Sequence, residues 1–174
     1  MIKNLPPAAV RSGGFTLIEL LVTVAIAVIL ITIAVPGFNS IIRNVRLTGL
    51  ANTLVADLQL ARSEAIKRNS TVRLCQSSDG ATCANNANWG LGWLMSHTVG
   101  ATTTTLNVQQ PVLTGYLVTG PILPVDFRST GGVGTPITFR ICPSVATADG
   151  QGREITLSIT GRPTVSATRT GLCS

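Results

Sequence analysis

The chain has 174 residues, of which 45% are hydrophobic and only 11% charged, and its mean hydropathy is +0.41. This composition excludes a disordered chain, which needs few apolar residues and many charges. A collagen-like chain is also excluded, because the 17 Gly and 9 Pro follow no three-residue period. The formal net charge of +6 allows an anionic partner without requiring one. The length fits one domain with an additional segment.

The apolar residues are concentrated near the start of the chain. Residues 20–42 contain no charged side chain. As a helix they would span about 34 Å, enough for the roughly 30 Å hydrocarbon layer of a bilayer, so we expect a membrane-spanning helix. Lys3 and Arg11 should stay cytoplasmic, which sends the residues after Arg43 to the far side. A secretory signal peptide cleaved near Ala34 is the alternative, but the apolar run is longer than a usual signal core.

A carboxylate, Glu19, stands at the start of this run, where a membrane segment accepts charge only at a cost of up to about 3 kcal/mol. The surrounding residues, Gly13-Gly14-Phe15-Thr16-Leu17-Ile18-Glu19-Leu20, resemble the processing motif of type IV pilins and of the pseudopilins of type II secretion. The resemblance continues through the apolar helix to Pro36. It implies that a prepilin peptidase cuts between Gly14 and Phe15, removes the leader 1–14 and methylates the new amino terminus.

The same resemblance gives Glu19 a role. Cleavage creates an α-amino group on Phe15, and a carboxylate in a low-dielectric setting can be compensated by such a cation on a neighbouring subunit. The resemblance therefore implies that Glu19 sets the register of subunit assembly. The alternative is an unpaired Glu19 whose carboxylate snorkels to the lipid headgroups.

The helical pattern continues beyond the apolar run. Pro36 and Gly37 should kink or loosen the helix, which then resumes. We expect it to extend from Phe15 to about residue 68, and Asn69-Ser70 to end it. Apolar residues recur at spacings of three and four, which predicts one buried stripe: Leu47, Leu50, Leu54, Leu58, Ala61 and Ala65. Glu64 and Arg68 stand at a favourable i,i+4 spacing. A coiled coil would give the same stripe, but the strand-rich sequence that follows favours packing on a sheet.

From Thr71 onward, apolar and polar residues alternate, which predicts half-buried antiparallel strands. The strongest strand patterns are 71–75, 105–109, 137–142 and 154–160, and weaker ones are 91–95, 116–119, 122–127 and 164–168. One helix and about seven strands predict an α+β fold in which an antiparallel sheet buries one face on the helix stripe, as the pilin resemblance also implies. The expected domains are the leader 1–14, a transmembrane or filament-core helix 15–42 and an exported domain 43–174.

Export would place the four cysteines where disulfides persist. Four cysteines allow three pairings. Proximity favours Cys75 with Cys83, which leaves Cys142 with Cys173 to fasten the tail to a strand. A zinc site is disfavoured because no C-x2-C spacing exists, so we expect no metal and no cofactor.

A second set of residues indicates which members of the pilin and pseudopilin family the chain resembles. The segments 60–69 (LARSEAIKRN), 72–75 (VRLC) and 89–93 (WGLGW), with Cys83, are similar to the H-type pseudopilin of type II secretion and to the FimT and FimU kinds of minor type IV pilins. The match is good over 13–95 and loose over 96–174. It implies an inner-membrane subunit with a periplasmic domain, which joins other pilins or pseudopilins in a type IV pilus or a secretion pseudopilus and helps to start assembly.

No set of residues in the sequence indicates an enzyme. The single His97 has no acidic neighbour in sequence, and we expect it in a loop or on the surface. The glycines of 131–134 lack the Gly-Lys-Ser/Thr ending of a phosphate-binding loop and predict a turn. The carboxylates show no paired or metal-ligand spacing.

The basic residues near the end of the chain raise the question of DNA binding. Residues 128–174 carry five Arg against two carboxylates, a net charge of +3. Some FimT-type pilins bind DNA in natural transformation through a Gly-Arg-x-Arg motif, of which Gly161-Arg162-Pro163-Thr164 matches only the first half. DNA uptake is therefore the alternative function, with Arg162, Arg169 and Arg153 as candidate contacts. Scattered solubilising Arg is the competing interpretation.

Overall fold

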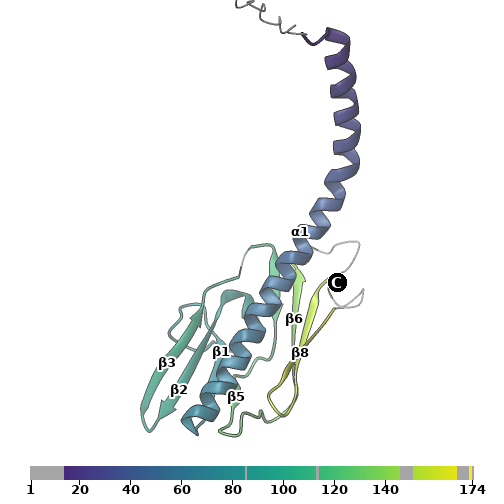
Figure 1. Cartoon of the computed structure of the whole chain (residues 1–174). Coiled ribbons are helices and arrows are strands. Elements are labelled where there is room, and N and C mark those ends of the chain that lie inside the picture. Colours follow the sequence, from purple (N-terminus) through teal and green to yellow (C-terminus); the bar gives the residue numbers. More distant parts are fainter. Residues whose placement is uncertain (1–13, 85, 113, 146–150, 168–172, 174) are drawn as a thin grey trace, which may run out of the picture. The chain divides into compact units, whose positions relative to one another are not determined.

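The computed structural model describes residues 14–84, 86–112, 114–145, 151–167 and 173, without the side chains of residues 33–37, 39 and 167. The chain divides into two compact units, Met1–Ile42 and Arg43–Ser174. One helix, α1 (Leu17–Arg68), contributes to both units and continues without interruption through Pro36 and Gly37. It is drawn from purple to blue in Figure 1.

Hydrogen bonds define both ends of α1. Thr16 caps its start, because the Thr16 hydroxyl accepts from the backbone N–H of Glu19 at 3.3 Å. The helix therefore begins at Leu17, two residues later than predicted. At the other end Asn69 takes a left-handed conformation with φ +48°, and Ser70 N donates to Ala65 O at 3.2 Å. This is a Schellman ending, and it confirms the predicted end of the helix.

The predicted stripe on α1 is the side that packs against the strands. Leu47, Leu54, Leu58, Ala61 and Ala65 are fully buried, and Leu50 is half-buried. Ala51, which the prediction left out, is buried as well. Figure 1 shows the second half of α1 lying across strands of both sheets, so the stripe covers a sheet core as expected.

The described part of the chain contains eight strands in two antiparallel sheets. Sheet A has the order β3-β2-β1-β5, and sheet B has the order β4-β6-β7-β8. A short 3-10 helix, η1 (Trp89–Leu91), precedes β2. The strands are β1 (Val72–Gln76), β2 (Trp93–Val99), β3 (Thr102–Gln109), β4 (Tyr116–Thr119), β5 (Val125–Phe127), β6 (Ile137–Pro143), β7 (Arg153–Leu157) and β8 (Pro163–Ala167).

The α+β class is confirmed, but the prediction of a single sheet is wrong. Consecutive strands β4 and β5 lie in different sheets, because β4 pairs with β6 while β5 pairs with β1. Pro121 and Pro124 stand between them, and neither has an N–H to continue a ladder. The chain therefore leaves sheet B after Thr119 and enters sheet A at Val125.

Several strand boundaries also differ from the prediction, and β3 and β5 begin at Thr102 and Val125 rather than at residues 105 and 122. Strand β2 extends to Val99, four residues beyond the predicted end, because it forms a long hairpin with β3. Strand β7 ends at Leu157 rather than at Thr160. The residues after it form a turn in which Gly161 N donates to Ser158 O at 2.8 Å.

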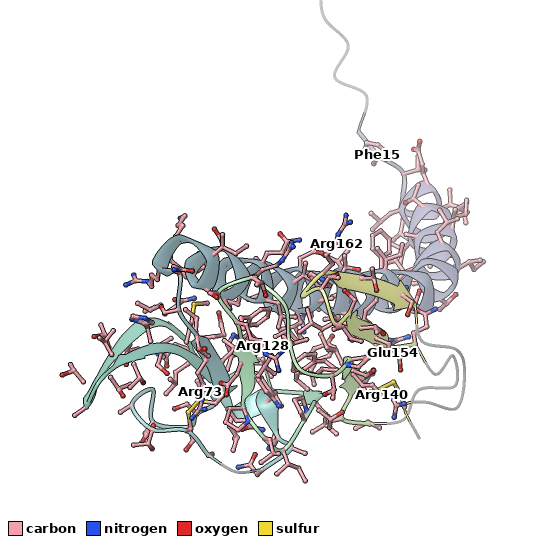
Figure 2. The ribbon with its side chains drawn as sticks, turned by 90° about the horizontal axis from the view of Figure 1, so that it is seen from below. Phe15, Arg73, Arg128, Arg140, Glu154 and Arg162 are labelled. Atoms are coloured by element: carbon pink, nitrogen blue, oxygen red, sulfur yellow. A yellow bond between two sulfur atoms is a disulfide. The ribbon has the colours of Figure 1, made fainter. Side chains whose placement is uncertain are left out.

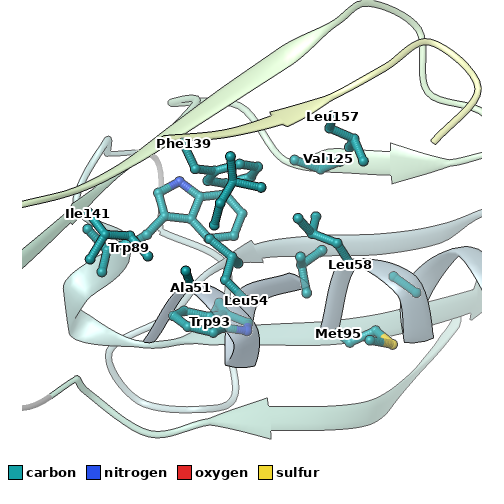
Figure 3. Close-up of a cluster of buried hydrophobic side chains, with 14 of the residues drawn as sticks. Ala51, Leu54, Leu58, Trp89, Trp93, Met95, Val125, Phe139, Ile141 and Leu157 are labelled. Atoms are coloured by element: carbon teal, nitrogen blue, oxygen red, sulfur yellow. The ribbon is translucent and has the colours of Figure 1, made fainter. Parts of the chain in front are cut away.

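The core lies between α1 and the two sheets and is centred on aromatic side chains (Figure 3). Trp89 from η1 meets Phe139 from β6 edge-on, with ring centroids 4.9 Å apart. Trp93 from β2 lies 6.4 Å from Trp89. These rings connect the two sheets beneath the helix stripe, and all three are almost fully buried.

Two disulfides connect loop or tail residues to strands in the unit Arg43–Ser174. Cys75 at the end of β1 is bonded to Cys83, and Cys142 in β6 is bonded to Cys173. These are the two pairs that proximity along the chain favours.

Candidate assembly and binding sites

The first half of α1 is apolar and uncovered. All described side chains from residue 14 to residue 32 are exposed, and Phe15 and Leu17 are 79% and 78% accessible. A helix that is apolar on all sides is normally buried in protein or in lipid. No helix within the described residues is long and apolar enough to cross a membrane. What the geometry shows is a helix surface suited to packing against other apolar surfaces.

Glu19 is the one charged residue on this surface. Its backbone N–H donates to Thr16, while none of the described residues donates a hydrogen bond to its carboxylate. Thr16 was not recognised from the sequence, although Thr16-x-x-Glu19 is the spacing of a capping box. The cap places the residue that would become the amino terminus, Phe15, directly in front of the helix.

The candidate DNA contacts do not converge. Arg162 is exposed in the turn between β7 and β8, near α1 in Figure 2. Arg153 lies at the opposite end of β7, where its guanidinium donates to Gly152 O at 2.8 Å and to the Thr48 hydroxyl at 3.3 Å. Arg169 is outside the described residues. The structure therefore separates Arg162 from Arg153.

A helix residue that the sequence did not single out, Arg62, lies against the turn that carries Arg162. A methyl group at Gly161 would lie 3.3 Å from Arg62 Cδ, so the turn packs directly on the Arg62 side chain. Arg62 Nε is buried without a hydrogen-bond partner among the described residues. Gly161 has φ +73°, a conformation that glycine adopts without strain. The Arg62 side chain from α1 therefore lies against the backbone of the turn that carries Arg162.

The most buried carboxylate among the described residues, that of Asp57, connects α1 to sheet A through hydrogen bonds. Asp57 is 8% exposed and accepts hydrogen bonds from Trp93 Nε1 at 2.8 Å and Asn107 Nδ2 at 2.9 Å. Burial raises its pKa, and the two hydrogen bonds oppose that shift. Its partners are 36 and 50 residues away in the sequence, which is why the pattern of α1 did not indicate them.

The other described carboxylates of this unit also have hydrogen-bond or ion-pair partners within the chain. Asp79 accepts from Thr82 and Ala81 backbone N–H groups and from nearby hydroxyls, which holds the pKa of its carboxyl far below the ordinary value. Arg73 forms a two-pronged ion pair with Asp126, and Arg140 pairs with Glu154 (Figure 2). The described residues contain no group of three His, Cys, Asp or Glu suited to a metal.

His97 is not in a loop or on the surface, so that prediction is wrong. It lies in β2 and is 9% exposed, because β2 extends farther than expected. Its Nε2 is 2.6 Å from the Ser70 hydroxyl. None of the described carboxylates bonds to its other ring nitrogen, so the pair lacks the acid that orients a catalytic histidine. The contact ties the end of α1 to sheet A.

The amino-terminal features and the fold together define a prepilin-type protein. Residues 10–35 match the prokaryotic N-terminal methylation motif, and residues 50–161 match the family model of the type II transport protein GspH. The GspH match spans more than half of the chain. The chain therefore belongs to the GspH family, and its family is one of structural pilins and pseudopilins.

Solved structures share the fold. The type IV minor pilin FimU of Pseudomonas aeruginosa strain PAO1 is 23% identical with a TM-score of 0.56 in one crystal form, covering 71% of this chain and 98% of FimU. In a second form it is 22% identical with a TM-score of 0.59, covering 74% and 96%. The minor pseudopilin EpsH from the type 2 secretion system of Vibrio cholerae is 17% identical with a TM-score of 0.52, covering 72% and 98%. None of the curated protein sequences matches the chain.

Proposed function

We propose that the chain is stored in the inner membrane by its apolar helix and, after processing, joins a type IV pilus or a type II secretion pseudopilus as a minor subunit that helps to start assembly. The observation that carries this proposal is the uncovered apolar half of α1, joined to a GspH-type unit that has its own core. Exposed apolar surface of this extent needs lipid before assembly and neighbouring helices after it. The unit 43–174 then lies in the periplasm, where its disulfides persist.

The processing step has a direct test. We expect the mature chain, isolated from cells that make a prepilin peptidase, to begin with an N-methylated Phe15. Intact-protein mass spectrometry measures the loss of residues 1–14 and the added methyl group. The matched variant Gly14→Val should keep the leader, because the amino acid before the cut is changed while α1 is not. An amino terminus near residue 34 would instead indicate a cleaved signal peptide.

The proposed partner of Glu19 in the filament is the α-amino group of Phe15 on a neighbouring subunit. The Glu19 carboxylate has no partner among the described residues of its own chain, so it is available for this contact. We expect Glu19→Ala to be cleaved and inserted normally but to be recovered in sheared filaments at roughly one hundredth of the normal level, because one member of a desolvated charge pair is lost. Thr23→Ala, one turn farther along, should assemble normally. Normal recovery of the Glu19→Ala variant would contradict the assembly role.

DNA binding in uptake is the second candidate function, and one contact favours it. The Arg62 side chain packs against the turn that carries the exposed Arg162, and guanidinium groups suit phosphate oxygens without reading base sequence. We expect a fluorescent duplex DNA to bind the mature chain at low salt, to dissociate as salt rises, and to bind Arg162→Ala more weakly. Arg153→Ala is the control, since Arg153 is already engaged with Thr48. Absence of binding at low salt would remove this candidate.

A further inference from the structure

A groove with a volume of about 820 Å³ lies between β5 and the start of β6, within the unit Arg43–Ser174. One wall is the apolar loop 121–124, and the other includes Val133 and Ile137. Arg128 and Asp126 also line it. The volume lies in the range of preformed binding sites in proteins. None of its lining residues belongs to residues 14–32 or to the turn 158–162.

The apolar wall is exposed yet held in place. Ile122 and Leu123 are 58% and 71% accessible. Behind them, Pro121 O accepts from Gln76 Nε2 at 2.6 Å and from Trp89 Nε1 at 3.0 Å, and both donor residues are buried. Because the loop backbone is fixed beforehand, a partner that covers these side chains loses little conformational freedom in ordering them.

The strand beside the groove has one edge with which no other described strand pairs. β5 is the outermost strand of sheet A and pairs with β1 on one side. Its other edge can receive hydrogen bonds from an added extended chain, which is a common way for proteins to bind peptides. An extended segment is therefore the shape of partner that fits this groove.

The charges of the groove specify the partner further. Arg73 holds Asp126 through two hydrogen bonds of 2.7 and 2.8 Å, which neutralises that carboxylate. Arg128 is exposed between the two sheets in Figure 2 and forms no ion pair with the described residues. Arg128 is thus the cation in the groove that has no described ion-pair partner. A carboxylate on the bound segment would complement its charge.

The described carboxylates of residues 43–174 are not available to bind Arg128. Within 43–174, each described carboxylate already has a hydrogen-bond partner in its own chain: Asp57, Glu64, Asp79, Asp126 and Glu154. The leader 1–14 contains no acidic residue. The described part of 43–174 in a second copy therefore offers Arg128 no unpaired carboxylate, which favours a different protein as the partner.

We propose that this groove binds an extended segment of a different subunit of the same filament. Aliphatic side chains of the segment pack on Ile122 and Leu123, its backbone pairs with β5, and a carboxylate binds Arg128. This inference rests on the proposed function, because it requires a filament in which unlike subunits are neighbours.

The test uses the full chain in cells that assemble the filament. A benzophenone amino acid at position 123 should crosslink, in sheared filaments, to one other subunit at a peptide that carries Asp or Glu. Arg128→Glu should lower the yield by about tenfold or more, and Arg128→Lys should largely retain it. The same crosslinker at Val99, on the tip of the β2–β3 hairpin, is the control for random collisions.

The outcomes separate the groove from the proposed function. If the chain is found in filaments but position 123 crosslinks only to lipid, only to a second copy or to nothing, the groove proposal is wrong while the filament role stands. A yield that Arg128→Glu leaves unchanged overturns the carboxylate contact. If the chain is absent from filaments, the proposed function fails, and the groove proposal fails with it.

Discussion

Buried polar side chains in this molecule connect α1 to sheet A at two points. Asp57 binds Trp93 and Asn107, and Ser70 binds His97. A satisfied polar contact in a core favours one arrangement of the elements, because any shift of the helix would leave a buried group without a partner. These contacts therefore fix where the apolar stripe sits along the strands.

We expect Asp57 to make stability depend on pH in a direction opposite to that of most carboxylates. Its pKa is raised in the folded state, so the stability gained by protonation is fully present below the unfolded pKa and is lost as pH rises through the folded pKa. Asp57→Asn keeps an oxygen that can accept from Trp93 but does not titrate. The stability of this variant relative to wild type should therefore be greater at pH 7 than near pH 4.

Thermal unfolding of the two mature chains in detergent, compared from pH 4 to pH 7, measures this difference. The lowered pKa of Glu64 and that of Asp79 act in the opposite direction, since their stabilisation is lost as pH falls. Both groups are present in both proteins, so their effects cancel in the comparison. Parallel curves for the two proteins would contradict the role assigned to Asp57.

At the residue scale, the sequence predicts local contacts better than distant ones. The Glu64–Arg68 pair was expected from its i,i+4 spacing and is present at 2.9 Å. The pairing of Asp57 with Trp93 and the meeting of Arg62 with Gly161 join residues far apart in the chain, and no periodicity encodes them. Glu19 and its neighbours were recognised because their motif is contiguous.

At the scale of elements, the alternation of side chains predicts strands but not their partners. Strand β4 was predicted at its observed bounds, and the stripe on α1 was predicted nearly complete. The division into two sheets was missed because pairing depends on contacts between distant segments. In hindsight, Pro121 and Pro124 are the local signal for the break between β4 and β5.

The end of α1 gives a prediction at this scale. Asn69 occupies the left-handed position of the Schellman ending with φ +48°. Asn69→Gly should raise the free energy of unfolding by up to about 1 kcal/mol, and Asn69→Ala should lower it by about 1 kcal/mol, because a Cβ is strained in this conformation and Asn tolerates it better than Ala. Chemical denaturation of the mature chains measures both changes. Equal stability of the Gly and Ala variants would contradict this account of the helix end.

For the whole molecule, the amino-terminal processing motif and the membership of the GspH family were predictable from the sequence. The binding surfaces were not. The Arg residues counted together in the sequence lie at different places, with Arg153 and Arg162 at opposite ends of β7. Charge totals do not say which cations are already paired. The groove beside β5 depends on both sheets, so it could be found only once their arrangement was known.

The two disulfides should contribute unequally to whole-molecule stability. The Cys142–Cys173 bond closes a loop with a sequence separation of 31, against 8 for Cys75–Cys83. In the chain-entropy description, the losses on removal are about 3.7 and about 2.5 kcal/mol. Thermal unfolding of the double Ser variants, Cys142→Ser with Cys173→Ser and Cys75→Ser with Cys83→Ser, measures the difference. A larger loss from the shorter loop would show that local loop packing outweighs chain entropy here.

The buried stripe on α1 has a consequence for the time course of synthesis. Leu47 precedes the strands that cover it, and the core residue Leu157 follows it by 110 positions. At about 5 to 20 residues per second, the stripe emerges roughly 5 to 20 s before its last covering strand does. During that interval the side chains of Leu47, Leu54 and Leu58 in the nascent chain are not yet covered by all of the strands. We expect a holding chaperone to occupy this segment until β7 has been made.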